Sequence, residues 1–103
     1  MASILVLYKT PTDPAAFDRY YLETHVPIAK KLPGLRKYEI SKGAVLTPGG
    51  PSRNVHLIAN LVFDDLAAIQ RAFSSPEGQA AGADVEKFST GGTEILLFDS
   101  LEV

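Results

Sequence analysis

The sequence contains no cysteine and only two histidines, His25 and His56. The first absence excludes disulfide bonds, thiolate nucleophiles and cysteine metal sites. The histidines lie far apart in the chain and no carboxylates cluster with metal-ligand spacing, so we expect no bound metal. No apolar run approaches membrane-spanning length and the N-terminus lacks a signal-peptide pattern. We therefore expect a soluble, cytoplasmic protein that does not enter a membrane.

The chain also has little excess charge of either sign. The chain has ten lysines and arginines and twelve aspartates and glutamates, so its formal net charge is −2. This charge balance provides no positive field to attract nucleic acid or an anionic membrane. The glycine pairs lack a phosphate-binding fingerprint and no serine lies in a nucleophile elbow. Nucleotide binding and serine-hydrolase chemistry are therefore not predicted, and we expect no cofactor.

What is present is the composition of one globular domain. The chain has 103 residues, of which 46% are hydrophobic and 21% charged. A chain of this length buries enough surface to form a core without disulfide or metal crosslinks. We assign residues 1–103 to a single domain.

The first part of the chain predicts a strand and then a helix. Residues 3–9 form a short apolar run typical of a strand buried on both faces. Asp13 can cap the helix with Pro14 at its first position. Pro27 predicts a kink near residues 24–25, and Pro33-Gly34 ends the helix. The inward face of this helix is predicted to carry Phe17, Tyr21, Thr24, Ile28 and Leu32.

The second part predicts two strands, two helical segments and a last strand. An edge strand over residues 35–46 and a loop over 47–52 precede the clearest strand, residues 55–63. Asp64-Asp65 can cap a helix, and a Ser-x-x-Glu pattern at Ser74 restarts a helix that ends near Phe88 and that two glycines weaken. The last strand covers residues 93–101. The apolar positions predicted for the helix after Asp65 are Leu66, Ile69 and Phe73.

This order of elements is that of an α+β, ferredoxin-like βαββαβ fold with a four-stranded antiparallel sheet. Two helices can cover only one face of such a sheet, yet two strands are apolar on both sides. The uncovered face would carry Ile58 and Val62. A contiguous apolar face of this kind usually marks an interface, so we expect a homodimer rather than a monomer with scattered exposed aliphatic residues.

Two stretches of the sequence are also similar to those of a known family. The first is Phe17-x-x-Tyr20-Tyr21-x-x-x-His25-Val26-Pro27-Ile28-Ala29, followed by Leu32-Pro33-Gly34-Leu35-x-x-Tyr38. The second comprises Phe73, Ser75-Pro76-Glu77-Gly78, Ala83-Asp84, Phe88 and Gly91-Gly92. With them the chain resembles EthD-like proteins over nearly its whole length. The resemblance implies a dimeric α+β barrel, a superfamily that includes lactone isomerases, cofactor-free monooxygenases, dehydratases and haem enzymes.

His25 is the best candidate for a catalytic residue. It lies one turn after Tyr21 at the edge of the apolar stripe, where an imidazole can enter a pocket and act as a general acid or base. The alternative is that His25 bonds a backbone carbonyl freed at the Pro27 break. We assign Tyr21 to the catalytic group with His25, and Tyr20 and Phe17 to ligand binding. The alternative for the tyrosines, and the commoner role of such residues, is core packing with a satisfied hydroxyl.

His56 and Asn60 are predicted to project from the same face of the strand over residues 55–63. If that face lines the dimer interior, they are polar groups in an apolar chamber and candidates for ligand binding. The alternative is that both are solvated or bonded across the interface.

Two functions fit these residues. The first is a cofactor-independent enzyme of a catabolic or secondary-metabolic pathway, acting on a small hydrophobic organic molecule by isomerisation, dehydration, decarboxylation or oxygenation. The second is a noncatalytic homodimeric protein that binds a small molecule or assists a partner oxidase. A histidine beside tyrosines favours the enzyme, whereas the lack of a paired acid–base set or metal motif favours the binding protein.

Overall fold

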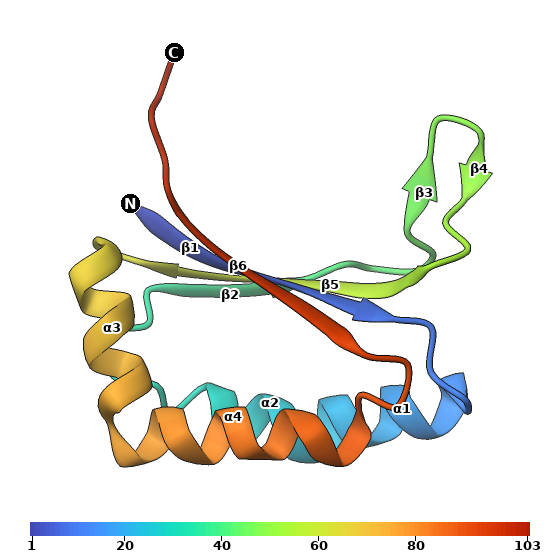
Figure 1. Cartoon of the computed structure of the whole chain (residues 1–103), viewed down its shortest axis with the longest axis horizontal. Helices are drawn as coiled ribbons and strands as arrows, with labels where there is room; N and C mark the ends of the chain where they lie inside the picture. The colour runs from blue at the N-terminus through green and yellow to red at the C-terminus, as the bar shows by residue number, and fades with distance from the viewer.

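The computed structural model describes residues 1–103 and has a four-stranded antiparallel sheet with all its helices on one side (Figure 1). The strand order is β2-β5-β1-β6, which confirms the predicted ferredoxin-like fold. A separate two-stranded hairpin, β3–β4, extends from the connection between β2 and β5. The strands are β1 (Ala2–Lys9), β2 (Lys37–Ile40), β3 (Leu46–Thr47), β4 (Gly50–Pro51), β5 (Val55–Phe63) and β6 (Thr93–Asp99). The helices are α1 (Pro14–Tyr20), the π-helix η1 (Tyr21–His25), α2 (Val26–Ala29), α3 (Leu66–Ser74) and α4 (Pro76–Phe88).

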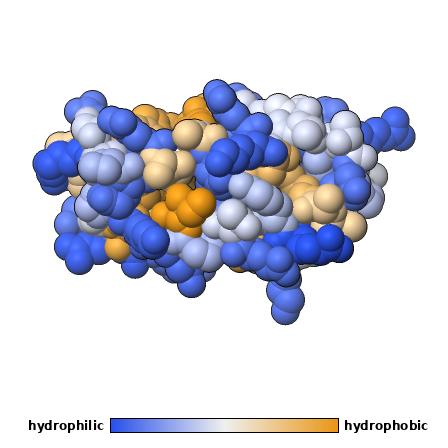
Figure 2. Space-filling model, turned by 90° about the horizontal axis from the view of Figure 1, so that it is seen from below, coloured by the Kyte–Doolittle hydropathy of each residue, from blue (hydrophilic) through white to orange (hydrophobic).

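The core lies between the sheet and the helices. Alternate residues of β1 and β5 point into it, as the period of two along a strand requires. They are Ala2, Ile4, Val6, Tyr8, Leu57, Ala59, Leu61 and Phe63, and all are buried. The outer surface of the helical side is mostly hydrophilic, with small apolar patches (Figure 2). No helix is long and apolar enough to cross a lipid bilayer.

The opposite side of the sheet carries no helix, and we call it the open sheet face (Figure 1). The register places Ile58 and Val62 here, as expected from their alternation with the buried residues of β5. β1 is therefore less buried on this side than predicted, because nothing in the chain covers it. The apolar members of the open sheet face are Leu5, Leu7, Ile58, Val62, Leu96 and Phe98.

The first helical segment begins and bends as the sequence indicates. Asp13 caps α1 by accepting a hydrogen bond from the Ala16 amide at 3.1 Å, and Pro14 follows it. The predicted kink is the π-helical turn η1. Pro27 has no N–H to donate and its ring crowds the carbonyl four residues earlier, so the backbone widens there. The wider turn leaves Thr24 exposed and buries His25, so the prediction that Thr24 faces inward is wrong.

The second pair of helices is joined at a tight corner. Asp65 caps α3, and Ser75, rather than the predicted Ser74, caps α4 by accepting from the Gly78 amide at 3.0 Å. A Cβ on Gly78 would lie 1.9 Å from the carbonyl oxygen of Ala72, so only glycine allows this approach. Despite its two glycines, α4 is continuous over 13 residues.

The predicted apolar face of α3 is only partly correct. Ile69 is fully buried, but Leu66 and Phe73 are 40% and 41% exposed. This helix stands across the end of the two layers, so its small residues Ala68 and Ala72 face the core and the larger ones flank it (Figure 1).

Candidate active site

A hydrogen-bonded triad with a buried His25–Asp84 pair and a partly buried Tyr20 links α1 and η1 to α4. The Nδ1 atom of His25 lies 2.9 Å from Oδ2 of Asp84, and the Tyr20 hydroxyl donates to the other carboxylate oxygen at 2.7 Å. His25 and Asp84 are each only 4% exposed. The triad therefore excludes the alternative in which His25 bonds a backbone carbonyl near Pro27.

The environment fixes the protonation of this triad. Burial lowers the pKa of His25 below its ordinary value, and the partly compensating bond from Asp84 does not reverse this effect. Burial alone would raise the pKa of Asp84, but the hydrogen bonds from Tyr20 and His25 outweigh it and leave that pKa lowered. At neutral pH Asp84 is thus a carboxylate and His25 an uncharged imidazole. The carboxylate can only accept, so Nδ1 carries the proton and Nε2 holds the free lone pair.

His25 lines an apolar cavity of about 70 Å³ between the sheet and the helices, in which 12 of the 15 lining residues are hydrophobic. Small residues of α4, Gly78, Ala81 and Gly82, form part of its wall. Phe73 and Ile95, both half-exposed, also line it. The cavity is smaller than most ligand pockets, but an apolar lining with a few convergent polar groups is typical of a small-molecule site.

Tyrosine hydroxyls provide the other polar groups of this cavity. The hydroxyls of Tyr21 and Tyr38 lie 2.6 Å apart, and the ring of Tyr8 packs edge-on against Tyr21. Burial raises the pKa of all three tyrosines, so they are protonated at neutral pH. The Tyr21 hydroxyl is bonded to those of Tyr38 and Tyr8, so two of the three hydroxyl hydrogens are used within this cluster and one is left to bind a ligand oxygen.

The other predicted residues take different positions. Phe17 is 3% exposed and packs in the aromatic core against Tyr8 and Phe88. Asn60 lies on the open sheet face, where its side-chain oxygen is buried without a hydrogen-bond partner. Neither residue borders the cavity beside His25.

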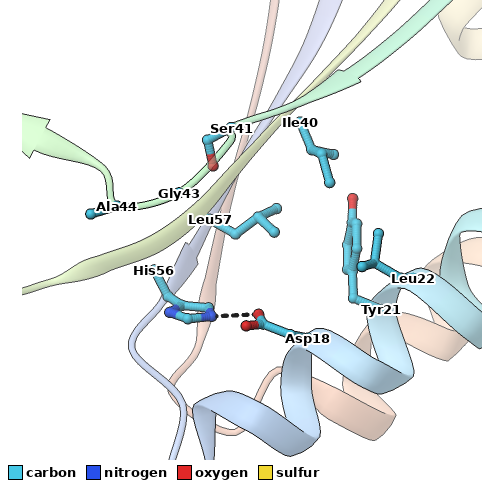
Figure 3. A pocket seen from close by; sticks show the side chains of 9 residues that line it. All are labelled: Asp18, Tyr21, Leu22, Ile40, Ser41, Gly43, Ala44, His56 and Leu57. Atoms are coloured by element: carbon cyan, nitrogen blue, oxygen red, sulfur yellow. Dashed lines mark hydrogen bonds and ion pairs between the residues drawn. The ribbon is translucent and has the colours of Figure 1, made fainter.

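The prediction that His56 shares the face of Asn60 is wrong. The pairing of β1 with β5 shifts by one residue between Tyr8 and Lys9, which marks a β-bulge opposite them in β5. The bulge turns His56 to the helical side, where its Nε2 lies 2.7 Å from Oδ1 of Asp18 (Figure 3). His56 thus belongs to a separate pocket, and no residue other than Tyr21 lines both this pocket and the cavity of His25.

Two residues of the site were not predicted. Asp84 was part of a family motif without a role, although an acid in line with Gly78, Ala81 and Phe88 on one helix face is a signal for a buried carboxylate. Tyr38 lies on an edge strand, and only the folded sheet brings its hydroxyl to Tyr21. No three potential metal-ligating side chains of the chain lie together.

Comparison with known proteins agrees with this architecture. The EthD domain matches residues 9–92. An uncharacterised 11.0 kDa protein of the thcB–thcC intergenic region of Rhodococcus erythropolis is 38% identical over 99 residues, which cover 96% of this chain and 94% of that protein. The crystal structure of an ethyl tert-butyl ether D (EthD) family protein from Bacillus halodurans superposes with a TM-score of 0.89 at 32% identity, over 98% of this chain and 99% of the other.

More distant structures share the fold alone. SnoaB, a cofactor-independent oxygenase from Streptomyces nogalater, has a TM-score of 0.68 at 18% identity, over 99% of this chain and 94% of its own. A dimeric ferredoxin-like protein of unknown function from Thermobifida fusca has the same TM-score at 15% identity, over 94% and 88% of the two chains. At these identities the likeness concerns architecture rather than chemistry.

Proposed function

We propose that this chain, which belongs to the EthD family, is a cofactor-independent enzyme that removes a proton from a small, neutral, mostly hydrophobic organic molecule. The observation that carries the proposal is the buried His25–Asp84 pair, held by the Tyr20 hydroxyl, beside an apolar cavity. An uncharged histidine held by a carboxylate is the arrangement of a general base. SnoaB shows that this fold can carry an enzyme that works without a cofactor.

The proton transfer follows from the hydrogen bonds. Nε2 of His25 accepts a proton from an acidic C–H or O–H group of the substrate, and the imidazolium that forms is stabilised by the Asp84 carboxylate at Nδ1. The negative charge left on the substrate oxygen is stabilised by the remaining hydroxyl hydrogen of the Tyr8–Tyr21–Tyr38 cluster. Tyr20 keeps Asp84 oriented toward the histidine. Isomerisation, dehydration and oxygenation in catabolic or secondary-metabolic pathways can each begin with such a step, whereas in a decarboxylation the proton is delivered to the carbanion after CO₂ has left.

Deuterium exchange tests the proton transfer without knowledge of the natural substrate. The wild-type protein should accelerate incorporation of deuterium from D₂O into the α-carbons of cyclohexanone above the buffer background. His25→Asn keeps a polar side chain but loses the base, so the acceleration should fall by about two to four orders of magnitude. His56→Asn is the matched control and should exchange like the wild type.

Two results would contradict this role. One is equal exchange by His25→Asn and wild type, and the other is a wild type that binds cyclohexanone at His25 without accelerating exchange. The second result, seen as a shift of the His25 ring signals in NMR, would favour a noncatalytic binding protein.

We also propose that the functional unit is a homodimer joined through the open sheet face. Six apolar residues lie on this face without a helix over them, and the orphaned oxygen of Asn60 lies among them. A structure with the same fold is a dimer.

Light scattering at micromolar concentration should give twice the chain mass of 11.1 kDa. Val62→Asp should halve that mass or unfold the protein, because it buries an unpaired charge. Leu66→Asp, the same type of change on half-exposed α3, should leave the dimer intact. A wild-type mass near that of one chain would overturn the proposal.

A further inference from the structure

A second, larger pocket lies on the helical side of the sheet, away from His25. Its volume is about 420 Å³, within the range typical of ligand sites. It is bounded by the first helical segment, the end of β2, the loop that follows it and the bulged start of β5 (Figure 3). The lining residues are Asp18, Tyr21, Leu22, Ile40, Ser41, Gly43, Ala44, His56 and Leu57.

One edge of this pocket is formed by a histidine whose position is fixed by its neighbours. His56 is fixed by the 2.7 Å contact of its Nε2 with Asp18 and by the edge-on ring of Phe17 at 5.1 Å. Because a carboxylate only accepts hydrogen bonds, Nε2 carries a proton, and Nδ1 can accept a hydrogen bond whenever the ring carries that proton alone. The β-bulge that aims His56 here is the kind of irregularity that often re-aims side chains beside functional sites.

The opposite edge of the pocket offers a donor. The Ser41 Oγ atom accepts a hydrogen bond from the Ile58 amide at 3.0 Å, so its own hydroxyl hydrogen is available to a ligand. Figure 3 shows Ser41 and His56 on opposite sides of Leu57, with Tyr21 and Ile40 along the third side. The two polar groups are thus separated by an apolar floor.

The charges around the pocket further restrict the chemical class of its ligand. None of the nine lining residues is a lysine or arginine, and the side chain of Asp18 is 54% exposed. An anion would be repelled by this carboxylate and would find no cationic partner. A purely apolar molecule would leave the hydrogen-bonding groups of His56 and Ser41 unpaired.

We propose that this pocket is a second small-molecule site, distinct from the cavity of His25. Its ligand is a neutral molecule with an apolar body, a hydroxyl that donates to His56 and an oxygen that accepts from Ser41. The apolar body packs on Leu57 and Ile40 and against the ring of Tyr21. The site does not depend on proton transfer at His25, because the two cavities share no lining residue except Tyr21.

Three probes of similar size test the chemistry of this site. Binding to the wild-type protein is measured by NMR titration, with the backbone amides of Gly43, Ala44 and Leu57 as reporters. 4-Hydroxybenzyl alcohol, which is neutral and has a hydroxyl at each end, should shift these signals and bind most tightly. p-Xylene lacks both hydroxyls and 4-hydroxybenzoate carries a charge, so each should bind at least about tenfold more weakly.

Four variants test whether the probe binds in this pocket. Ala44→Phe puts a ring into the pocket and should abolish binding of 4-hydroxybenzyl alcohol, whereas Ala80→Phe on the exposed surface of α4 is the size-matched control. His56→Leu should weaken binding about tenfold through loss of the acceptor. His25→Asn should not change it, so failure of the proposed catalytic role leaves this test intact.

Some outcomes would overturn the proposal. They are the absence of binding, tightest binding of the anion or of p-xylene, or equal affinity of Ala44→Phe and Ala80→Phe. The thermal melting of each variant shows whether a loss of binding comes from a loss of folding. If His56→Leu is unfolded, Ser41→Ala tests the opposite edge and should also weaken binding.

Discussion

The molecule contains the same chemical pair twice, in two different environments. The side chains of His25 and Asp84 are each 5% exposed, whereas those of His56 and Asp18 are 22% and 54% exposed. Asp84 has both oxygens bonded, one by His25 and one by Tyr20. Asp18 is open to water, which screens its charge. The comparison shows that burial, rather than the identity of the pair, makes His25 the candidate base.

The two histidines also share a structural cause. The π-helical turn η1 rotates His25 into the core, and the β-bulge of β5 rotates His56 toward the helices. Each irregularity changes the direction in which one side chain points. The regular parts of the helix and strand on either side keep their usual pattern of inward and outward residues. Both candidate sites are therefore built where the periodicity of a helix or strand is interrupted.

The largest expected difference between the pairs is in stability. Asp84→Ala leaves the buried N–H of an uncharged imidazole and the Tyr20 hydroxyl without their acceptor, and should lower the free energy of unfolding by about 1–3 kcal/mol. Asp18→Ala removes an exposed partner and should cost about 0–1 kcal/mol. Urea unfolding of the two variants and the wild type measures both values.

An equal loss of unfolding free energy in Asp84→Ala and Asp18→Ala would contradict this comparison. It would mean that the His25–Asp84 pair is as well solvated as the exposed one. Asp84→Asn sharpens the test, because the amide retains a hydrogen-bonding oxygen and should restore part of the stability lost in Asp84→Ala.

Much of the fold could be predicted because its signals are local. The cap at Asp13, the break caused by Pro27 and the alternation along β5 each depend on residues close together in the chain. The ferredoxin-like order of elements then follows from a small number of allowed connections. The errors at Leu66 and Phe73 arose because the tilt of α3 across the end of the layers is a tertiary feature.

Only part of the candidate site could be predicted from the sequence, because its other residues are brought together by tertiary packing. His25 could be chosen because it lies beside Tyr21 near the helix break, but its partner Asp84 is 59 residues away and meets it only when α4 packs beside η1. The direction of His56 was wrong because simple alternation along a strand does not reveal a bulge. Contacts between distant elements and interruptions of periodicity are what the sequence conceals here.

A smaller difference between the histidines should appear in the dependence of stability on pH. Burial lowers the pKa of His25 in the folded protein, whereas in the unfolded chain His25 titrates near its ordinary value of about 6.5. As the pH falls through that value, the unfolded state binds a proton that the folded state resists. The free energy of unfolding should therefore decrease between pH 7 and 5, by at most about 1.4 kcal/mol per pH unit.

Variants of each histidine assign this pH dependence. Asp84 also has a lowered pKa, but its stabilising effect is lost only as the pH falls below the ordinary range of a carboxyl, about 4, so it contributes little in this window. His25→Asn removes the titrating group and should flatten the decrease, whereas His56→Asn, in the exposed pair, should retain it. Urea unfolding at pH 7, 6 and 5 measures the slopes. An unchanged slope in His25→Asn, or a flattened one in His56→Asn, would assign the protonation to another group and remove the functional distinction between the two pairs.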